Sequence, residues 1–216
     1  MKLLRRLFGG GERGDVSARR WVVLDVETTG LDVHHDRLLA IAAIGVQVDA
    51  EAAPRIRLAD SFEAVLHHDA VLADKDNILL HGIGVGEQRA GTPVAAALSA
   101  FEQWLAGAPL LAFHAAFDQA MIAGAMKAAL GRTLTNPWLD LEPVADALHP
   151  DVGGTALDDW LAHFGIECAV RHQAAADTLA TAELLLRLWP AARAQRHASF
   201  AGLRRLAAQR RWLVPR

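Results

Sequence analysis

The stretch WVVLDVETTG at residues 21–30 indicates both the fold and the chemistry of this chain. Its apolar run followed by a Thr-Thr-Gly turn predicts a buried strand that ends abruptly. Because side chains alternate along a strand, Asp25 and Glu27 are expected on one face while Val26 points to the other. Neighbouring carboxylates repel each other unless a cation neutralises them, and the turn amides at 28–30 can face a phosphate. The alternative interpretation is an ordinary polar end to a strand.

The segments around this stretch predict an α/β fold built on one mixed sheet. Further strands are expected at 37–48, 55–66 and 109–113, and helices at 93–106, 117–130, 141–148, 155–164, 174–188 and 200–213. The short spacing of the first three strands favours antiparallel neighbours. Three strands, then alternating helix and strand, then helices are typical of an α/β layer fold.

Composition excludes several classes of protein. The 216 residues are 52% apolar, enough for a sizeable core, and the single cysteine, Cys168, excludes a disulfide framework or a cysteine-cluster zinc site. The longest apolar run, residues 38–46, is well short of the ~20 residues that span a bilayer. Arginines interrupt the apolar residues of the N-terminus, so no signal peptide is expected. We therefore expect a soluble, cytoplasmic protein with no membrane partner.

Charge divides the chain into three parts. The net charge is −3, but residues 1–20 carry +4 and residues 193–216 carry +7, which leaves −14 for residues 21–192. We therefore expect a basic N-terminal arm, an acidic catalytic body and a basic C-terminal helix. This distribution is typical of a metal-dependent enzyme that acts on nucleic acid. Alternatively, the arginine-rich ends are simply solvated.

Three more residues complete a set that could carry chemistry. Asp118 lies at the start of a predicted helix, where an acid also simply favours the helix dipole. His172 and Asp177 are five residues apart, so on a single helix they would diverge by ~140°. They can converge only if His172 lies in the loop before the helix. The alternative is a surface histidine and a helix-start aspartate.

Three motifs in this order together resemble a known family. They are LDVETTGLD (24–32), AFHAAFD (112–118) and RHQAAADTLATAELL (171–185), and the segment LLHGIGVGEQRAGTP (79–93) fits between them. They resemble the motifs of the DEDDh-class 3′–5′ exonucleases, and are most similar to the proofreading epsilon subunits of bacterial DNA polymerase III. The resemblance implies a ribonuclease-H-like fold with a five-stranded mixed sheet flanked by helices. The sister class uses a tyrosine base, and this chain contains no tyrosine.

The resemblance also implies roles for individual residues. His172 matches the general base, and one departure is Phe113-His114, where the family often has His-Asn. The four carboxylates that match the ligands of two Mg²⁺ or Mn²⁺ ions are Asp25, Glu27, Asp118 and Asp177. The positions that match contacts to the 3′ nucleotide are Thr28, Thr29, Leu31 and His81.

The expected function is metal-dependent 3′–5′ hydrolysis of DNA that releases nucleoside 5′-monophosphates. Single-stranded or frayed 3′ ends are the expected substrate, and the chain could work alone or as a polymerase subunit in proofreading or repair. One alternative is an RNA-trimming exonuclease similar to RNase T or oligoribonuclease. The other is a non-catalytic nucleic-acid-binding module, which has no physical need for four clustered carboxylates.

Overall fold

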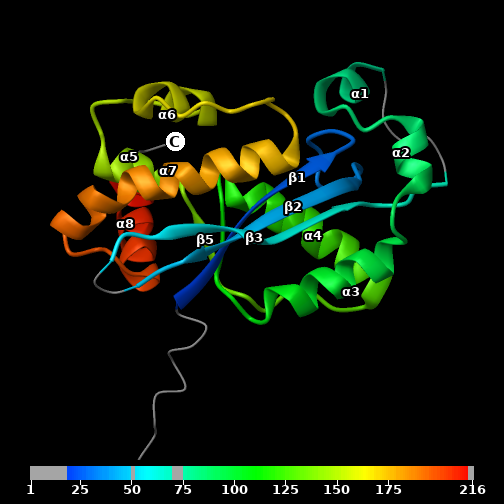
Figure 1. Ribbon diagram of the computed structural model, residues 1–216, viewed down its shortest axis with the longest axis horizontal. Helices are drawn as coiled ribbons and strands as arrows, with labels where there is room; N and C mark the ends of the chain where they lie inside the picture. Colours follow the sequence, from blue (N-terminus) through cyan, green and yellow to red (C-terminus); the bar gives the residue numbers. More distant parts are fainter. Residues whose placement is uncertain (1–18, 50–51, 70–74, 214–216) are drawn as a thin grey trace, which may run out of the picture.

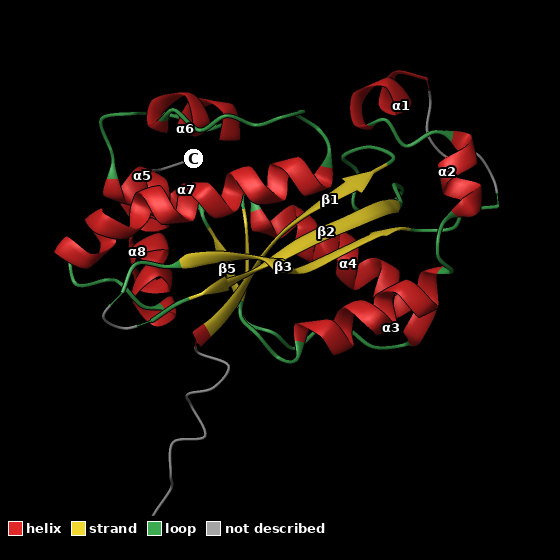
Figure 2. Cartoon of the chain, in the orientation of Figure 1, coloured by secondary structure: helices red, strands yellow, loops and turns green. Residues whose placement is uncertain are grey.

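The computed structural model describes residues 19–49, 52–69 and 75–213, and its centre is one mixed sheet (Figures 1 and 2). The strands are β1 (Arg20–Thr28), β2 (Leu38–Gln47), β3 (Arg55–Val65), β4 (Leu110–Ala112) and β5 (Trp138–Asp140). Their order is β3-β2-β1-β4-β5, with β1, β2 and β3 antiparallel and β4 and β5 parallel to β1. The predicted five-stranded mixed sheet is thus confirmed.

Helices cover both faces of this sheet. They are α1 (Lys75–His81), α2 (Val85–Ala90), α3 (Val94–Leu105), α4 (Ala115–Leu130), α5 (Glu142–Leu148), α6 (Leu157–Phe164), α7 (Ala174–Ala194) and α8 (Phe200–Leu213). One apolar core joins the sheet to α3 and α4, and the other joins it to α5, α6, α7 and α8 (Figure 1). No helix in the described ranges is long and apolar enough to cross a membrane.

The alternation of side chains along β1 decides which face receives the acidic residues. Trp21 and Val23 pack into the core beneath α5 to α8, whereas Val22 and Leu24 pack into the core beneath α3 and α4. Since residues two apart share a face, Asp25 and Glu27 continue the row begun by Trp21 and Val23, toward α7. The sequence prediction of a shared face is consistent with this packing.

The opposing strand leaves room beside these acids. In the antiparallel register, Asp25 pairs with Ala42 and Glu27 pairs with Ala40, so both neighbours across the ladder are small. The Thr178 hydroxyl on α7 donates a hydrogen bond of 3.1 Å to the Ala42 carbonyl. This bond holds the first turns of α7 against the part of the sheet that carries Asp25.

Several boundaries differ from the sequence prediction. The strand β5 was not predicted because three residues are too few to show a periodicity, and glycines at 82, 84 and 86 hid the short helices α1 and α2. The helix α7 was expected to end at Leu188 but continues through Pro190 to Ala194. Burial of Trp189 and Ala192 offsets the hydrogen bond that a proline removes.

The predicted terminal segments are described in part. Residues 1–18 of the expected N-terminal arm and residues 214–216 lie outside the described residues. The helix α8 packs against α5, with Leu203 and Leu206 buried, and the ring centroids of Phe200 and Trp21 are 5.5 Å apart. The C-terminal helix is therefore packed into the same core as the sheet.

Candidate active site

The structure brings the four predicted carboxylates to one end of the sheet. They come from three elements: Asp25 and Glu27 lie in the last residues of β1, while Asp118 and Asp177 lie in the first turns of α4 and α7. The residues Asp118 and Asp177 are buried, at 4% and 5% exposure of the whole residue. Because residues from distant parts of the chain converge here, the cluster is a product of the tertiary fold.

Burial and mutual repulsion disfavour the charged forms of the two strand acids. Burial, followed by the negative charge of Asp177, raises the pKa of Asp25 to about 8, and the cation of Arg171 partly opposes this. Burial, followed by the charges of Asp25 and Asp177, also raises the pKa of Glu27 to about 8. These carboxyls therefore need a positive partner to be fully ionised at neutral pH.

Two further observations fit a cation held by this cluster. The Glu27 Oε1 atom is buried without a hydrogen-bond partner, which is costly for a carboxylate oxygen unless another group satisfies it. Burial, followed by the charge of Asp25, raises the pKa of Asp118 well above its ordinary value, although the Val26 N–H donates a hydrogen bond to it. Clustered carboxylate oxygens are the donor set that Mg²⁺ and Mn²⁺ prefer.

Asp140, at the end of β5, supports the helix that carries Asp118. Its Oδ1 accepts hydrogen bonds from the His114 N–H at 3.0 Å and the Glu142 N–H at 3.2 Å. His114 begins α4 in the left-handed conformation, with φ of 58°. The Phe113-His114 departure from the family motif thus falls at a helix start that Asp140 holds in place. Sequence reasoning missed Asp140, and an acid directly after the apolar pair at 138–139 was the only signal.

His172 lies in the loop before α7, as the five-residue spacing predicted. It is exposed and left-handed, with φ of 61°, and its N–H donates a hydrogen bond of 3.0 Å to Asp177 Oδ2. Because His172 lies in the loop before α7 and Asp177 lies in its first turn, the His172 backbone can reach the Asp177 carboxylate. The role of His172 as a base stays a prediction.

Arg171 connects the cluster to α6, a contact that the sequence did not reveal. Its Nε donates a hydrogen bond of 2.5 Å to Asp158 Oδ1, and its Nη1 donates to Asp177 Oδ1. The Cys168 thiol also donates to Asp177 Oδ1, at 3.4 Å. Within residues 19–49, 52–69 and 75–213, no three acidic, histidine or cysteine side chains form a ready-made cation site.

The residues predicted to contact the 3′ nucleotide lie around the Thr-Thr-Gly turn. The Thr28 hydroxyl donates to the Gly30 carbonyl at 2.7 Å, and the Thr29 hydroxyl donates to Asp36 Oδ1 at 2.7 Å. Leu31, directly after the turn, is 86% exposed. The turn is thus rigid and presents an apolar side chain to solvent, which suits contact with a nucleobase.

His81 is buried beside this turn and uses both ring nitrogens within the protein. Its Nδ1 accepts a hydrogen bond from the Ile83 N–H at 3.0 Å, so Nε2 is the donor to Asn77 Oδ1 at 2.7 Å. Asn77 in turn donates to the Thr28 carbonyl at 3.2 Å. Asn77 therefore ties α1 to the end of β1, and His81 fixes the Asn77 side chain; the contact of His81 with a nucleotide stays a prediction.

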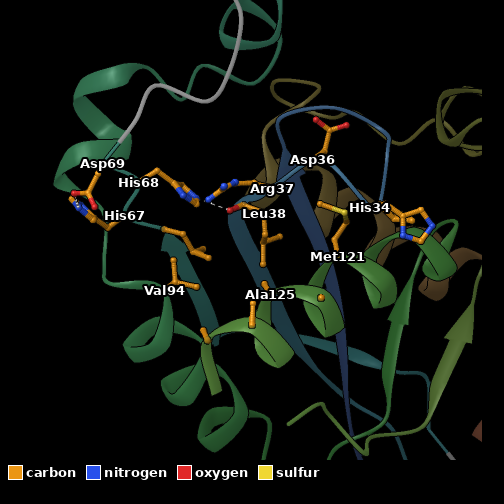
Figure 3. Close-up of a pocket in the computed structure, with 15 residues that line it drawn as sticks. His34, Asp36, Arg37, Leu38, His67, His68, Asp69, Val94, Met121 and Ala125 are labelled. Atoms are coloured by element: carbon orange, nitrogen blue, oxygen red, sulfur yellow. Dashed lines mark hydrogen bonds and ion pairs between the residues drawn. The ribbon is translucent and has the colours of Figure 1, made fainter. Parts of the chain in front are cut away.

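A pocket of about 720 Å³ opens next to the turn (Figure 3). It lies between the β1–β2 loop, the residues after β3, and α4, and Met121 lines it one helical turn beyond Asp118. Arg37 and His68 face each other at its rim in Figure 3, and the Arg37 N–H donates to the Thr29 hydroxyl at 3.0 Å. Its volume lies in the range of small-molecule sites, about 300–1,000 Å³. None of the four carboxylates lines this pocket, which Met121 relates to Asp118 only through their shared position in α4.

Comparison with known proteins identifies the family. The sequence profile of the RNase T exonuclease family matches residues 22–185, which include all four carboxylates and His172. The chain belongs to this exonuclease family. The resemblance seen in the motifs is therefore confirmed, and family membership places the domain among nucleases.

Individual relatives match only through part of their length. A DNA polymerase III of the PolC type from Clostridium perfringens is 30% identical over 165 residues, which is 76% of this chain and 11% of that protein. Escherichia coli exonuclease I with a dT13 oligonucleotide superposes with a TM-score of 0.66 at 22% identity, covering 82% of this chain and 42% of that one. The zinc-bound complex of the same enzyme with single-stranded DNA superposes with a TM-score of 0.62 at 24% identity, covering 79% of this chain and 42% of that one. The shared fold confirms the predicted ribonuclease-H-like architecture of the exonuclease domain.

Proposed function

We propose that this exonuclease domain removes nucleotides from the 3′ end of DNA by metal-dependent hydrolysis and releases nucleoside 5′-monophosphates. The observation that carries the proposal is the convergence of four carboxylates from β1, α4 and α7 beside an exposed histidine. Burial raises the pKa of Asp25 and of Glu27 to about 8, and such a cluster is hard to explain without a cation.

The carboxylates would hold two divalent cations, Mg²⁺ or Mn²⁺. Asp25 is the best candidate for a ligand shared by both cations, because it lies close enough to interact with the other two acids. The charge of Asp177 raises the pKa of Asp25, and the charge of Asp25 raises the pKa of Asp118. When bound, two such ions neutralise the phosphoryl oxygens, acidify a water and stabilise the leaving oxygen. Glu27 would complete one set of ligands with its unsatisfied Oε1.

His172 is proposed to take the proton from the attacking water. A general base must reach solvent and the reacting atoms, and His172 is exposed while its N–H is fixed to Asp177 Oδ2. Imidazole titrates near neutral pH, which suits both accepting and returning a proton at physiological pH.

The Thr-Thr-Gly turn and the pocket beside it would bind the substrate strand. Thr28, Thr29 and Leu31 would hold the 3′ nucleotide, and His81 would support the turn through its hydrogen bond to Asn77. The upstream nucleotides would pass the pocket rim, where Arg37 can meet a phosphate and the exposed apolar side chain of Val33 can meet a base. Exonuclease I in complex with dT13 has the same fold, which supports a single strand as the substrate.

A substrate panel tests the preference for DNA and the direction of cleavage. Matched 5′-labelled oligomers of single-stranded DNA, duplex DNA with a frayed 3′ end, and RNA should be shortened from the 3′ end, with DNA fastest. A faster rate on RNA would support the RNA-trimming alternative. The similarity to PolC-type polymerases supports a role beside a polymerase, and addition of a polymerase subunit to the same assay would test it.

Removal of metal should abolish hydrolysis but leave the protein folded. The two apolar cores contain no proposed ligand, so the fold does not depend on the cation. Excess EDTA should eliminate nucleotide release and Mn²⁺ should restore it, while circular dichroism shows a folded protein throughout. Persistent hydrolysis in excess EDTA would rule out the metal mechanism.

The basic helix α8 should contribute to binding through its exposed arginines. Truncation would open the core through Phe200 and Leu203, so the test is the double substitution Arg204→Gln with Arg205→Gln. Removing one arginine–phosphate interaction should reduce the slope of log affinity against log salt by about 0.7 for single strands. Fluorescence anisotropy would measure the slope, with Arg55→Gln on β3 as the control. An unchanged slope would mean that α8 does not contact the strand.

A further inference from the structure

Asp177 already has a cationic partner, and all its donors belong to one loop. Its Oδ1 accepts from the Arg171 guanidinium and the Cys168 thiol, and its Oδ2 accepts from the His172 N–H. The carboxylate therefore fixes the loop at 168–172 against the start of α7. A cation that approaches Asp177 at Oδ1 meets the bound guanidinium, and one that approaches at Oδ2 still meets its positive charge across the same carboxylate.

Arg171 also has a second carboxylate within reach. Its Nε lies 2.5 Å from Asp158 Oδ1 on α6, and the Asp158 side chain is 64% exposed, whereas that of Asp177 is 8% exposed. The same side chain thus spans a buried acid in the cluster and a solvated acid outside it. If the contact to Asp177 opened, the contact to Asp158 could keep the guanidinium paired.

We propose that Arg171 is an internal counter-ion that a divalent cation must displace from Asp177. The inference rests on the proposed function, in which Asp177 holds a cation. A guanidinium and a divalent ion at one carboxylate oxygen repel each other and compete for the same lone pairs. Competition of this kind couples the two equilibria: the cation weakens the Arg171–Asp177 contact by the same factor by which Arg171 weakens cation affinity.

The electrostatics of the cluster support this competition. The charge of Arg171 acts on Asp25 and on Glu27 in the direction that lowers the pKa of each carboxyl, although burial outweighs it. In the metal-free protein, Arg171 therefore stabilises part of the negative charge that a cation would otherwise neutralise. Arg171 is thus a positioning residue, because it acts through Asp177.

The test is cation affinity in the full chain without nucleic acid. Isothermal titration with Mn²⁺ should show Arg171→Gln binding about tenfold more tightly than the wild type, a factor within the ordinary range of site-to-site coupling. The melting temperature of the metal-free variant should fall, because the cluster loses its counter-ion. Saturating Mn²⁺ should then raise the melting temperature of Arg171→Gln by more than that of the wild type, since tighter binding stabilises more.

Two further variants separate contact from charge. Arg171→Lys keeps the charge but loses the planar, two-armed contact, so its dissociation constant should lie between those of the wild type and Arg171→Gln. If the Mn²⁺ dissociation constant of Arg171→Lys equals that of the wild type, only the positive charge matters, and the proposed displacement of the guanidinium contact is wrong. Arg132→Gln removes a comparable ion pair, to Glu102 at 2.7 Å, away from the cluster and should leave Mn²⁺ affinity unchanged.

The outcomes distinguish this inference from the proposed function. An unchanged or weaker affinity in Arg171→Gln, with equal decreases of melting temperature with and without Mn²⁺, would make Arg171 merely structural and overturn the inference. Should Arg171→Gln not fold, the comparison of Arg171→Lys with the wild type decides the question. Absence of Mn²⁺ binding by the wild-type protein would instead overturn the proposed function.

Discussion

Asp25→Asn should abolish hydrolysis and at the same time stabilise the metal-free protein at pH 8. In the proposed mechanism the variant would lose a negative ligand of the cations, which is worth several kcal/mol of charge stabilisation, or about 10³-fold in rate. Nucleotide release from a 5′-labelled oligomer at saturating Mg²⁺ measures this effect. Activity like that of the wild type would contradict the assignment of Asp25.

The stabilisation follows from the direction of the pKa shift. Burial raises the pKa of Asp25 to about 8, above its unfolded value, so this carboxyl favours folding fully below about pH 4 and loses that contribution as the pH rises toward 8. The asparagine side chain does not ionise, so its contribution to folding stability does not decrease as the pH rises. Each tenfold change in a proton dissociation constant corresponds to about 1.4 kcal/mol, or about 3–6 °C in Tm for a chain of this size.

Thermal melts of the metal-free protein at pH 6 and pH 8 test this expectation. The wild type should melt lower at pH 8 than at pH 6, and Asp25→Asn should reduce the difference. The control Asp151→Asn removes an exposed acid between α5 and α6 and should leave the difference unchanged. A variant that melts below the wild type at pH 8 would contradict the expected relief of repulsion.

The same substitution at Asp177 should give the opposite change in stability. Asp177 accepts hydrogen bonds from Arg171, Cys168 and His172, so Asp177→Asn breaks an ion pair that is largely buried. We expect abolished activity together with a lower melting temperature. Comparison of the two variants would separate ligand removal, which they share, from their opposite effects on the fold.

His172→Asn should lower kcat by 10² to 10⁴-fold while the Mg²⁺ concentration for half-maximal activity changes little. A general base contributes a factor of about this size to the rate, whereas loss of a metal ligand also lowers the affinity for the cation. Asparagine suits the position because it tolerates the left-handed conformation, φ of 61°, better than alanine does. The effect on kcat then reports the imidazole rather than the backbone.

The pH profile makes this test specific. The wild-type rate should rise with pH in a step that reports a general base, and this step should disappear in His172→Asn. Higher pH should restore part of the rate, because hydroxide needs no base. His163→Asn, on the exposed face of α6, is the control. If the step persists and the Mg²⁺ midpoint moves tenfold, His172 is a ligand and the base lies elsewhere.

Those parts of the site that depend on local spacing could be predicted from the sequence. The alternation of β1 places Asp25 and Glu27 on one face, and the five-residue spacing requires His172 to precede the helix. Both features follow from backbone periodicity, which a single segment of sequence contains. The five-stranded sheet was expected only through the resemblance, because β5 is too short to be recognised by itself.

Contacts between loops could not be predicted in the same way. Arg171 reaches Asp158 on α6, Asp140 holds the start of α4, and both contacts depend on how separate elements pack. The burial of His81 and its bond to Asn77 likewise depend on packing, while its expected contact with a nucleotide stays a prediction. Such partners are set by tertiary distances that no local pattern encodes.

The pairing of Asp25 with Ala42 and of Glu27 with Ala40 makes the geometry of the site depend on the register between β1 and β2. A slip of β1 by one residue would turn both acids into the core beneath α3 and α4 and expose Leu24 and Val26 in their place. Burying two carboxylates among aliphatic side chains is strongly unfavourable, so the misregistered chain is excluded energetically. The proposed active site can therefore form only when β1 pairs with β2 in this register, because both acids must face α7.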